Sequence, residues 1–328
     1  MTDLTTNYMG FRLKNPVIAG SCGLTSNLDD IVKLYKAGAA AVILKSLFEE
    51  EIRIELEKES KKMRQEGFLY PETLDFYDTY DVEDTLTGYL RLIRECKQKM
   101  DIPVFASINC VSADKWPYYA STLQDAGADA LELNAFILPS SFDTRSPENE
   151  KLYFDIAAAV KKEVTIPVAM KISYYNAGLA AFIRDLSYSG IAGLVLFNRF
   201  YSPDIDLEKM EVVATHVFSS PTDLPVSLRW IAMMHGRVGC SLAASTGVHD
   251  GKALIKQLLA GADAVQVVSA LYRNGVNAVT AMLTELSEWM SRKHYSTIDE
   301  FRGILSCRNA PDPAAYERVQ FMKHFAGK

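Results

Sequence analysis

One short pattern occurs four times along the chain and constrains the fold more than any other feature. A small residue and a glycine follow an amphipathic segment, and a run rich in Ala, Val and Leu comes next, as in KAGAAAVILKS, DAGADALELNA, YSGIAGLVLFN and LAGADAVQVVS. The glycine suits the left-handed position after a helix end, and the apolar run suits a strand that is buried on both faces. Each copy therefore predicts a helix that leads into a buried strand.

A second pattern supplies further strands. The segments DIPVFASIN and TIPVAMKIS place a proline at the beginning of an apolar run, where the missing backbone N–H costs little. Parallel strands are thus predicted at residues 16–20, 40–45, 103–108, 130–134, 167–173, 193–198, 240–246 and 264–270. Eight strands that alternate with helices are typical of a (β/α)8 barrel, the TIM barrel. A doubly wound open sheet is the alternative, but no G-x-G-x-x-G motif opens the first helix.

Two long connections, residues 46–102 and 199–239, interrupt this alternation. Insertions that follow barrel strands tend to lie over the active site at the C-terminal face. We therefore expect a single barrel domain over residues 1–328, with 46–102 as a lid or an interface segment. Within that insertion, the charge-dense EEEIRIELEKESKKMRQEG reads as a solvated helix, and FLYPETLDFY is the candidate for a lid or a partner surface.

Composition disfavours several classes of protein. The formal net charge is -6, which argues against nucleic acid and anionic membranes as partners, and no run approaches the ~20 apolar residues of a membrane span. The five cysteines form no C-x-x-C motif and the five histidines are scattered, so we expect no disulfide framework and no metal site. The N-terminus has no signal-peptide pattern, and the simple interpretation is a cytoplasmic protein with reduced thiols.

Polar residues follow the predicted strands, where the chemistry of a barrel enzyme takes place. Lys45 and Lys171 end two buried strands, and a lysine there is costly unless an anion or another hydrogen-bonding partner meets it. Asn134 and Asn198 end two further buried strands, and we expect the side chains of these two asparagines and two lysines to meet in one site. Further polar residues at strand ends are Ser21, Cys22, Ser46, Ser107, Asn109, Cys110, Glu132, Ser173, Arg199, Ser245, Gln266 and Ser269.

The last two strands carry a signal for a phosphorylated ligand. Ser245-Thr246-Gly247 follows the seventh predicted strand and Ser269 follows the eighth, and a predicted helix comes after each. Backbone N–H groups of such loops, together with a helix N-terminus, form the phosphate site of many barrels at this position. A turn alone needs the same residues, so the signal rests on the two loops together.

The chain resembles the dihydroorotate dehydrogenase family, in particular its soluble branch. The resemblance runs over most of the chain, through NPVIAGSCG, AGAAAVILKS, PVFASINCVS, LELN, IPVAMKIS, LVLFN and STGVHDGKALIKQLLAGADAVQVVSALYRNG. It implies a barrel that binds FMN at the strand C-termini, and a homodimer. By position, it implies flavin contacts for Ser21, Lys45, Ser46, Asn134 and Lys171, phosphate contacts for Thr246, Gly247 and Ser269, and substrate contacts for Lys45, Asn134 and Asn198.

The chain also departs from the family pattern. The family's catalytic base, a Cys or Ser, follows the strand-four Asn by three residues, and here that residue is Ile137, which cannot take a proton. The family's substrate loop is replaced by QEGFLYPETL, and its Asn two residues beyond the base by Pro139. Candidates for a displaced acid or base are Lys45, Cys110 and Ser140, with Ser141, Tyr174 and Tyr175 as further possibilities.

The resemblance implies an FMN-dependent oxidoreductase that moves a hydride from a substrate C–H to flavin N5, with Lys171 near the flavin N1–O2 edge. The substrate would be dihydroorotate or another small planar molecule, and a partner subunit could accept the electrons. Two alternatives stay open. One is a flavin-binding or electron-relay subunit without substrate turnover. The other is an aldolase-type barrel in which Lys45 or Lys171 forms a Schiff base with a sugar phosphate, which needs a lysine of depressed pKa.

Overall fold

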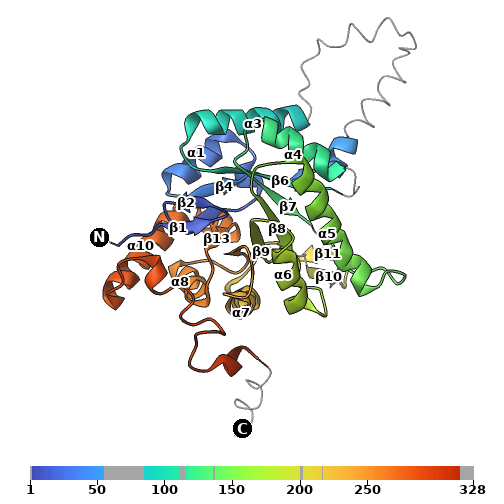
Figure 1. Cartoon of the computed structure of the whole chain (residues 1–328). Coiled ribbons are helices and arrows are strands. Elements are labelled where there is room, and N and C mark those ends of the chain that lie inside the picture. The colour runs from blue at the N-terminus through green and yellow to red at the C-terminus, as the bar shows by residue number, and fades with distance from the viewer. Residues whose placement is uncertain are drawn as a thin grey trace, which may run out of the picture.

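The structure, a computed structural model, describes residues 2–54, 85–110, 115–135, 137–199, 202–215 and 217–317. Eight parallel strands close into a barrel, and helices surround it, so the predicted (β/α)8 fold is confirmed (Figure 1). In ring order the strands are β3 (Val17–Ala19), β4 (Ala41–Ile43), β6 (Val104–Asn109), β7 (Ala130–Asn134), β8 (Val168–Ile172), β9 (Gly193–Leu196), β12 (Ser241–Ala244) and β13 (Ala264–Val267). Every one of them overlaps a predicted strand, and the β4–β6 and β13–β3 pairings close the ring.

The helices form the outer layer of the molecule. They are α1 (Leu28–Lys36), α3 (Thr85–Lys99), α4 (Lys115–Asp125), α5 (Ser146–Glu163), α6 (Leu179–Ser187), α7 (Leu224–Met234), α8 (Gly251–Ala260), α9 (Ser269–Asn274) and α10 (Ala278–Lys293). Short 3-10 helices are η1 (Gly23–Thr25), η3 (Pro221–Asp223), η4 (Ile298–Glu300) and η5 (Pro313–Tyr316). Within the described residues, no helix is both long and apolar enough to cross a membrane.

The glycines of the repeated pattern do what the pattern predicts. Gly38, Gly127, Gly190 and Gly261 all have positive φ, between 88° and 115°. Glycine populates this left-handed region without the steric cost that a side chain incurs. At the end of α8, for example, the N–H of Gly261 donates to the carbonyl oxygens of Gln257 and Leu258. Each glycine therefore lets the chain turn from a helix into the next strand.

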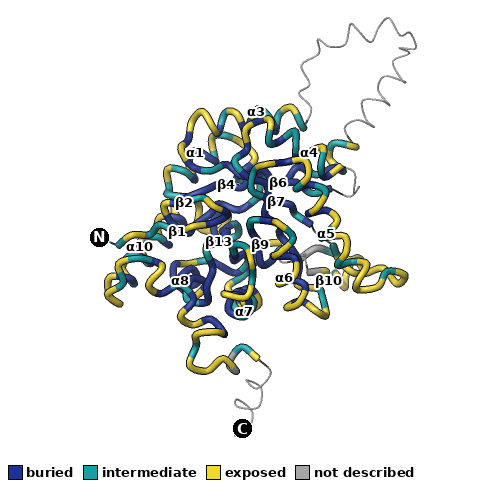
Figure 2. The backbone as a smooth tube through the Cα atoms, viewed as in Figure 1, coloured by how far each residue is buried: buried dark blue, intermediate teal, exposed yellow. Residues whose placement is uncertain are grey.

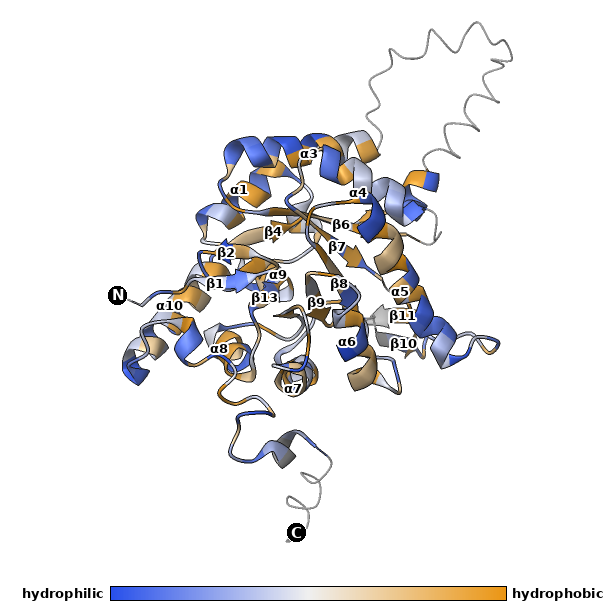
Figure 3. Cartoon of the chain, viewed as in Figure 1, coloured by the Kyte–Doolittle hydropathy of each residue, from blue (hydrophilic) through white to orange (hydrophobic). Residues whose placement is uncertain are grey.

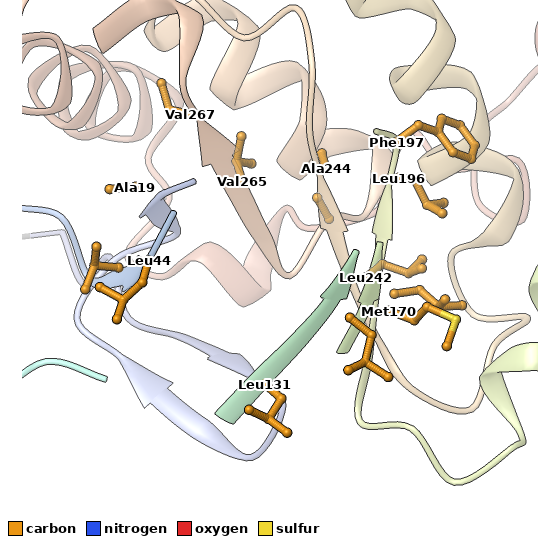
Figure 4. Close-up of a cluster of buried hydrophobic side chains, with 14 of the residues drawn as sticks. Ala19, Leu44, Leu131, Met170, Leu196, Phe197, Leu242, Ala244, Val265 and Val267 are labelled. Atoms are coloured by element: carbon orange, nitrogen blue, oxygen red, sulfur yellow. The ribbon is translucent and has the colours of Figure 1, made fainter. Parts of the chain in front are cut away.

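Alternation along the strands divides the apolar residues into two cores. Residues such as Leu131, Met170 and Leu242 point outward and pack against the helices (Figure 4). A smaller cluster fills the barrel interior, and it includes Phe105 and Val195. The barrel strands are accordingly buried and mostly hydrophobic, whereas the helices expose hydrophilic residues on their outer faces (Figures 2 and 3). This period of two decides which side chains reach the inside of the barrel.

Smaller elements lie outside the ring. Strands β1 (Thr6–Tyr8) and β2 (Phe11–Leu13) form an antiparallel hairpin, and β5 (Leu47–Phe48) pairs with the end of β6. The long connection at 199–239 contains a second hairpin, β10 (Ser202–Asp206) and β11 (Glu211–Thr215), before η3 and α7. Of the 46–102 insertion, residues 55–84 lie outside the described residues. They include most of the predicted charged helix and all of FLYPETLDFY.

Candidate active site

A cavity lies at the C-terminal ends of the barrel strands. It is lined by one residue within β8 and one within β13, by residues that follow β3, β9, β12 and β13, and by the chain before η3. Its lining contains six residues that the sequence analysis placed in the site, namely Ser21, Lys171, Asn198, Thr246, Gly247 and Ser269. The remaining lining residues are Phe197, Arg199, Val217, Ser219, Ser245, Val248, Gln266 and Val268. The strand ends thus bring together side chains that are up to about 250 residues apart in sequence.

A buried polar group stands at the floor of this cavity. Lys171 Nζ donates a hydrogen bond of 3.1 Å to Gln266 Oε1, and Gln266 Nε2 donates one of 2.5 Å to Glu132 Oε2. Lys171 Nζ also lies 3.9 Å from Glu132 Oε1. Lys171 is 8% exposed and Glu132 is 2% exposed, so both charges are largely withdrawn from water. Because a buried cation is costly alone, this carboxylate and amide explain how Lys171 is tolerated.

The strand geometry explains why these three side chains meet. Glu132, Lys171 and Gln266 lie two residues beyond Ala130, Ala169 and Ala264, which belong to the interior cluster. Side chains two apart on a strand share a face, so all three point into the barrel. In the β7–β8 register Glu132 lies beside Ala169 and Lys171 lies beside Asn134, so the carboxylate is one layer deeper than the ammonium group. The small alanines below leave room for the long polar chains. Burial raises the pKa of the Glu132 carboxyl, and the cation of Lys171 opposes that rise.

The two predicted asparagines converge at the same end of the barrel. Asn198 Nδ2 donates a hydrogen bond of 2.5 Å to Asn134 Oδ1, across the ends of β9 and β7. Asn198 Oδ1 in turn accepts a 2.9 Å bond from the backbone N–H of Arg199. Asn198 lines the cavity, and its hydrogen bond holds the side chain of Asn134 in place. This pair can present amide donors and acceptors to a polar planar ligand.

Hydroxyl groups and backbone amides gather on the side of β12 and β13. Ser219 N donates to Ser269 Oγ at 2.9 Å, and Gly247 N donates to Ser219 Oγ at 3.3 Å. His249 Nε2 lies 3.3 Å from the same Ser219 Oγ. Burial, and then the charge of Arg273, lowers the pKa of His249. Gly247 and Ser269 occupy two of the positions predicted for phosphate contacts, and hydroxyl and backbone N–H groups of this kind bind phosphate oxygens in many barrels.

Three predicted residues lie beside the cavity and not in its described lining. Ser46 N donates to Ser21 Oγ at 2.9 Å, and Ser46 Oγ lies 2.8 Å from Ser107 Oγ, so Ser46 supports Ser21 from behind. Asn134 contributes through its bond to Asn198. Lys45 Nζ forms an ion pair of 3.0 Å with Glu51 Oε1. Its side chain is directed to the segment after β5, and the two predicted lysines are therefore not brought together.

The candidates for a displaced base occupy different surroundings. Cys110 is 9% exposed and belongs to the core between strands and helices. Ser140 lies on an exposed loop, where its Oγ bonds the carbonyl oxygen of Leu138, and Ser141 is exposed beside it. Ile137 packs against the core, and its carbonyl oxygen accepts a 3.4 Å hydrogen bond from Ser173 Oγ. In the described part of the chain, none of these four lines the cavity.

A second cavity adjoins the first and shares Asn198 and Arg199 with it. Tyr174 and Tyr175 line it, and their rings stack with centroids 4.7 Å apart. Arg199 Nη1 donates to the carbonyl oxygen of Val217, and Nε lies 3.7 Å from Asp223 Oδ2. Burial, followed by Tyr175, raises the pKa of Tyr174. Of the candidate acids and bases, the two tyrosines therefore line this second cavity, next to Asn198.

Sequence reasoning gave no role to several residues of the site. Glu132, Arg199 and Gln266 were visible as polar residues at strand ends, but their partners follow only from the barrel register. Ser219 lies just before η3, and nothing in the segment HVFSSPTDLP points to a ligand. The turn signals around Ser219 could identify a loop, but they could not show that Ser219 approaches Gly247.

The arrangement suits a flavin mononucleotide. A fixed cation at the floor would face a ring edge that gains negative charge, and the hydroxyl and amide cluster would hold a phosphate. Thr246 and Gly247 have φ of 76° and 81°, so two successive residues of this loop adopt positive φ, and both line the cavity. The donor set of the described cavity therefore fits the predicted cofactor.

Comparisons with known proteins agree with this geometry. The sequence model of the family described as "Dihydroorotate dehydrogenase" matches residues 82–290. A curated protein of Thermoplasma volcanium, "Dihydroorotate dehydrogenase B (NAD(+)), catalytic subunit", is 24% identical over 93% of this chain and 99% of its own length. Proteins with the same description from Petrotoga mobilis (25% identical, 93% of this chain, 100% of their own) and Methanothermobacter thermautotrophicus (23%, 92%, 98%) are also similar.

Proposed function

The chain belongs to the dihydroorotate dehydrogenase family, and on that premise we propose that it is an FMN-dependent oxidoreductase acting on a CH–CH bond of a small planar substrate. The observation that carries the proposal is the shared cavity. Lys171 lines it from inside the barrel, and the cluster of Ser219, Gly247 and Ser269 lines it on the side of β12 and β13. Bound FMN would supply the electron acceptor, taking a hydride from a substrate C–H at flavin N5.

The chain's own residues would divide the work of binding. Ser219, Thr246, Gly247 and Ser269 would hold the phosphate through hydroxyl and backbone donors. Lys171 would present its charge to the N1–O2 edge of the ring, where a fixed cation stabilises the negative charge of the reduced state. Ser21 and Asn198 would contact the ring and the substrate, with Ser46 and Asn134 supporting them.

Dehydrogenation also releases a proton, which a base beside the substrate must accept. The family's position for that base is Ile137, whose carbonyl oxygen is bonded to Ser173 and whose side chain has no ionisable group. Tyr174 and Tyr175 line the cavity next to Asn198, so they are the first candidates to substitute. Lys45, Cys110 and Ser140 are the weaker candidates because they lie outside the described lining. Because Ile137 stands where the family has its base, we propose two kinds of substrate. One is dihydroorotate itself, and the other is a close planar analogue of it.

The Schiff-base alternative is less well supported. An amine that attacks a carbonyl must be neutral and open to its substrate. Lys171 Nζ is held beside Glu132 and Gln266, and Lys45 Nζ is paired with Glu51, so each amine is already in contact with a polar partner. Both lysines are thus placed as fixed cations. The non-catalytic flavoprotein remains the outcome to be separated from an enzyme by experiment.

Three further features belong to the proposal. The relatives named above are described as catalytic subunits, which supports an electron-accepting partner protein for this chain as well. We propose a cytoplasmic location and a homodimer, as the resemblance implies. The insertion 46–102, part of which lies outside the described residues, is proposed to cover the site or to meet a partner.

The function can be tested by anaerobic reduction of the bound flavin. FMN-loaded protein is mixed with dihydroorotate and with a small panel of dihydropyrimidines, and the visible flavin absorbance is followed in a stopped-flow instrument. We expect at least one of these compounds to bleach the flavin. If none does while dithionite still reduces it, the dehydrogenase proposal is contradicted and a flavin-binding subunit without this turnover is left.

A further inference from the structure

Glu132 stands directly behind the two cavity residues Lys171 and Gln266. Both of these line the cavity, whereas Glu132 is 2% exposed and is not part of the lining. Gln266 links the other two, because its Oε1 accepts from Lys171 Nζ and its Nε2 donates to Glu132 Oε2. A ligand on the cavity floor would therefore meet the cation and the amide, with the carboxylate one layer below.

One oxygen of this carboxylate is unsatisfied. Glu132 Oε1 is buried and has no hydrogen-bond partner among the described residues, and it lies 3.9 Å from Lys171 Nζ. Buried carboxylate oxygens nearly always have such a partner, and each exception calls for an explanation. A charge role explains it here, since the Coulomb attraction between Glu132 and Lys171 does not require a hydrogen bond.

Other titratable groups near Glu132 are uncharged at neutral pH. Tyr8, from β1, and Tyr89, from α3, are both buried, and burial raises the pKa of each phenol. The interior positions around the pair hold small or apolar side chains, such as Ala169 and Val195. Within the described residues, Lys171 is thus the one cation in ion-pair contact with Glu132.

We propose that Glu132 is a positioning residue that holds Lys171 at the cavity floor and sets the flavin reduction potential by opposing the charge of that lysine. This inference rests on the proposed binding of FMN. A cation near the ring stabilises the reduced, negatively charged state and raises the potential, and a carboxylate behind the cation offsets part of that effect. Glu132 therefore keeps the potential lower than Lys171 alone would.

The test is the midpoint potential of the bound flavin in Glu132→Gln, measured by dye-coupled reductive titration. The substitution removes the negative charge with little change in shape. We expect the reduction equilibrium to shift about tenfold toward the reduced flavin, which for a two-electron couple is a rise of about 30 mV. Glu132→Asp, which keeps the charge, should stay near the wild-type potential.

Two controls separate this role from a general effect. Glu288→Gln removes the same charge from α10, where the side chain is 64% exposed, and should leave the potential unchanged. In a Lys171→Ala background, Glu132→Gln should also have little effect, because burial raises the pKa of the Glu132 carboxyl and, without the opposing cation, the carboxyl becomes neutral like the glutamine. An equal rise in both backgrounds would show that Glu132 does not act through Lys171.

The outcomes are distinguishable from those of the proposed function. A wild-type chain that takes up no FMN contradicts both proposals. A yellow Glu132→Gln protein with the wild-type potential contradicts only this one. If Glu132→Gln does not fold, the wild-type potential is measured against pH. Where Glu132 gains a proton, the potential should rise by more than the about 30 mV per pH unit of a reduced flavin held as its anion, which takes up one proton per two electrons, and a constant one-proton slope would overturn the inference.

Discussion

Lys171 is the side chain on which most of the proposed chemistry depends. It reaches the cavity from β8 with its ammonium group fixed by Gln266 and Glu132. A cation held in place by its own protein needs no rearrangement when charge develops on a ligand, and preorganised groups of this kind are the most effective in catalysis. We therefore expect Lys171 to affect both the stability of the fold and the chemistry of the proposed flavin.

We predict that Lys171→Ala lowers the flavin midpoint potential and weakens FMN binding. The truncated chain also leaves Glu132 buried without its cation, and breaking such a pair typically costs about 3–5 kcal/mol. Reductive titration, a fluorescence titration with FMN and chemical denaturation measure the three effects. Adding Glu132→Gln should recover part of the lost stability, which serves as the internal control. An unchanged potential together with unchanged affinity would show that Lys171 does not contact the flavin.

At the scale of single residues, the sequence shows which residues belong to the site better than it shows their hydrogen-bond and ion-pair partners. Lys171 and the pair Asn134–Asn198 were recognisable because polar side chains at buried strand ends need a reason. The partner of Lys45 was not recognisable. It pairs with Glu51, six residues later, through the local path of the chain after β5, and a strand pattern contains no information on that path.

The loop between β12 and α8 is the element that shapes the proposed phosphate side. Thr246 and Gly247 both have positive φ there, and Asp250 caps α8 by accepting from the N–H of Ala253. A Cβ on Gly247 would lie 2.2 Å from the backbone nitrogen of Leu224, at the beginning of α7. The glycine is therefore required both by its conformation and by the close approach of another helix.

Gly247→Ala should consequently destabilise the protein and abolish tight FMN binding. A left-handed alanine costs roughly 1–2 kcal/mol by itself, and the contact with rigid backbone adds to this, so we expect a loss of about 3 kcal/mol or more. Gly190→Ala is the matched control, because Gly190 has φ of 88° and nothing within 4 Å of the added Cβ. Denaturant midpoints give the comparison. Equal losses for the two variants would argue against the close approach of α7.

Elements with a strong period were predictable, and elements without one were not. The eight barrel strands have continuous apolar runs, and glycines end the helices before four of them. The hairpin β10–β11 was not predicted. Ile205, Leu207 and Met210 of this hairpin are 61–83% exposed, so they do not produce the pattern of a buried face. Hydrophobic patterning predicts burial, and here there is little burial to predict.

For the molecule as a whole, the closure of the ring creates the site. Ser21 from the first barrel strand and Ser269 from beyond the last line one cavity because β13 pairs with β3. The fold class predicted this edge of the barrel as the place for chemistry, since ligands bind at the C-terminal ends of the strands. Distances across the cavity could not be predicted, because they depend on strand register and on the lengths of side chains packed together.

The most direct test of the account is the flavin content of the purified chain. We predict a yellow protein that releases close to one FMN per chain on heating, or that takes up FMN to this ratio when the cofactor is added to cofactor-free protein. Absorbance of the released flavin, set against the protein concentration, measures the ratio. A colourless chain that fails to bind added FMN would contradict the central claim.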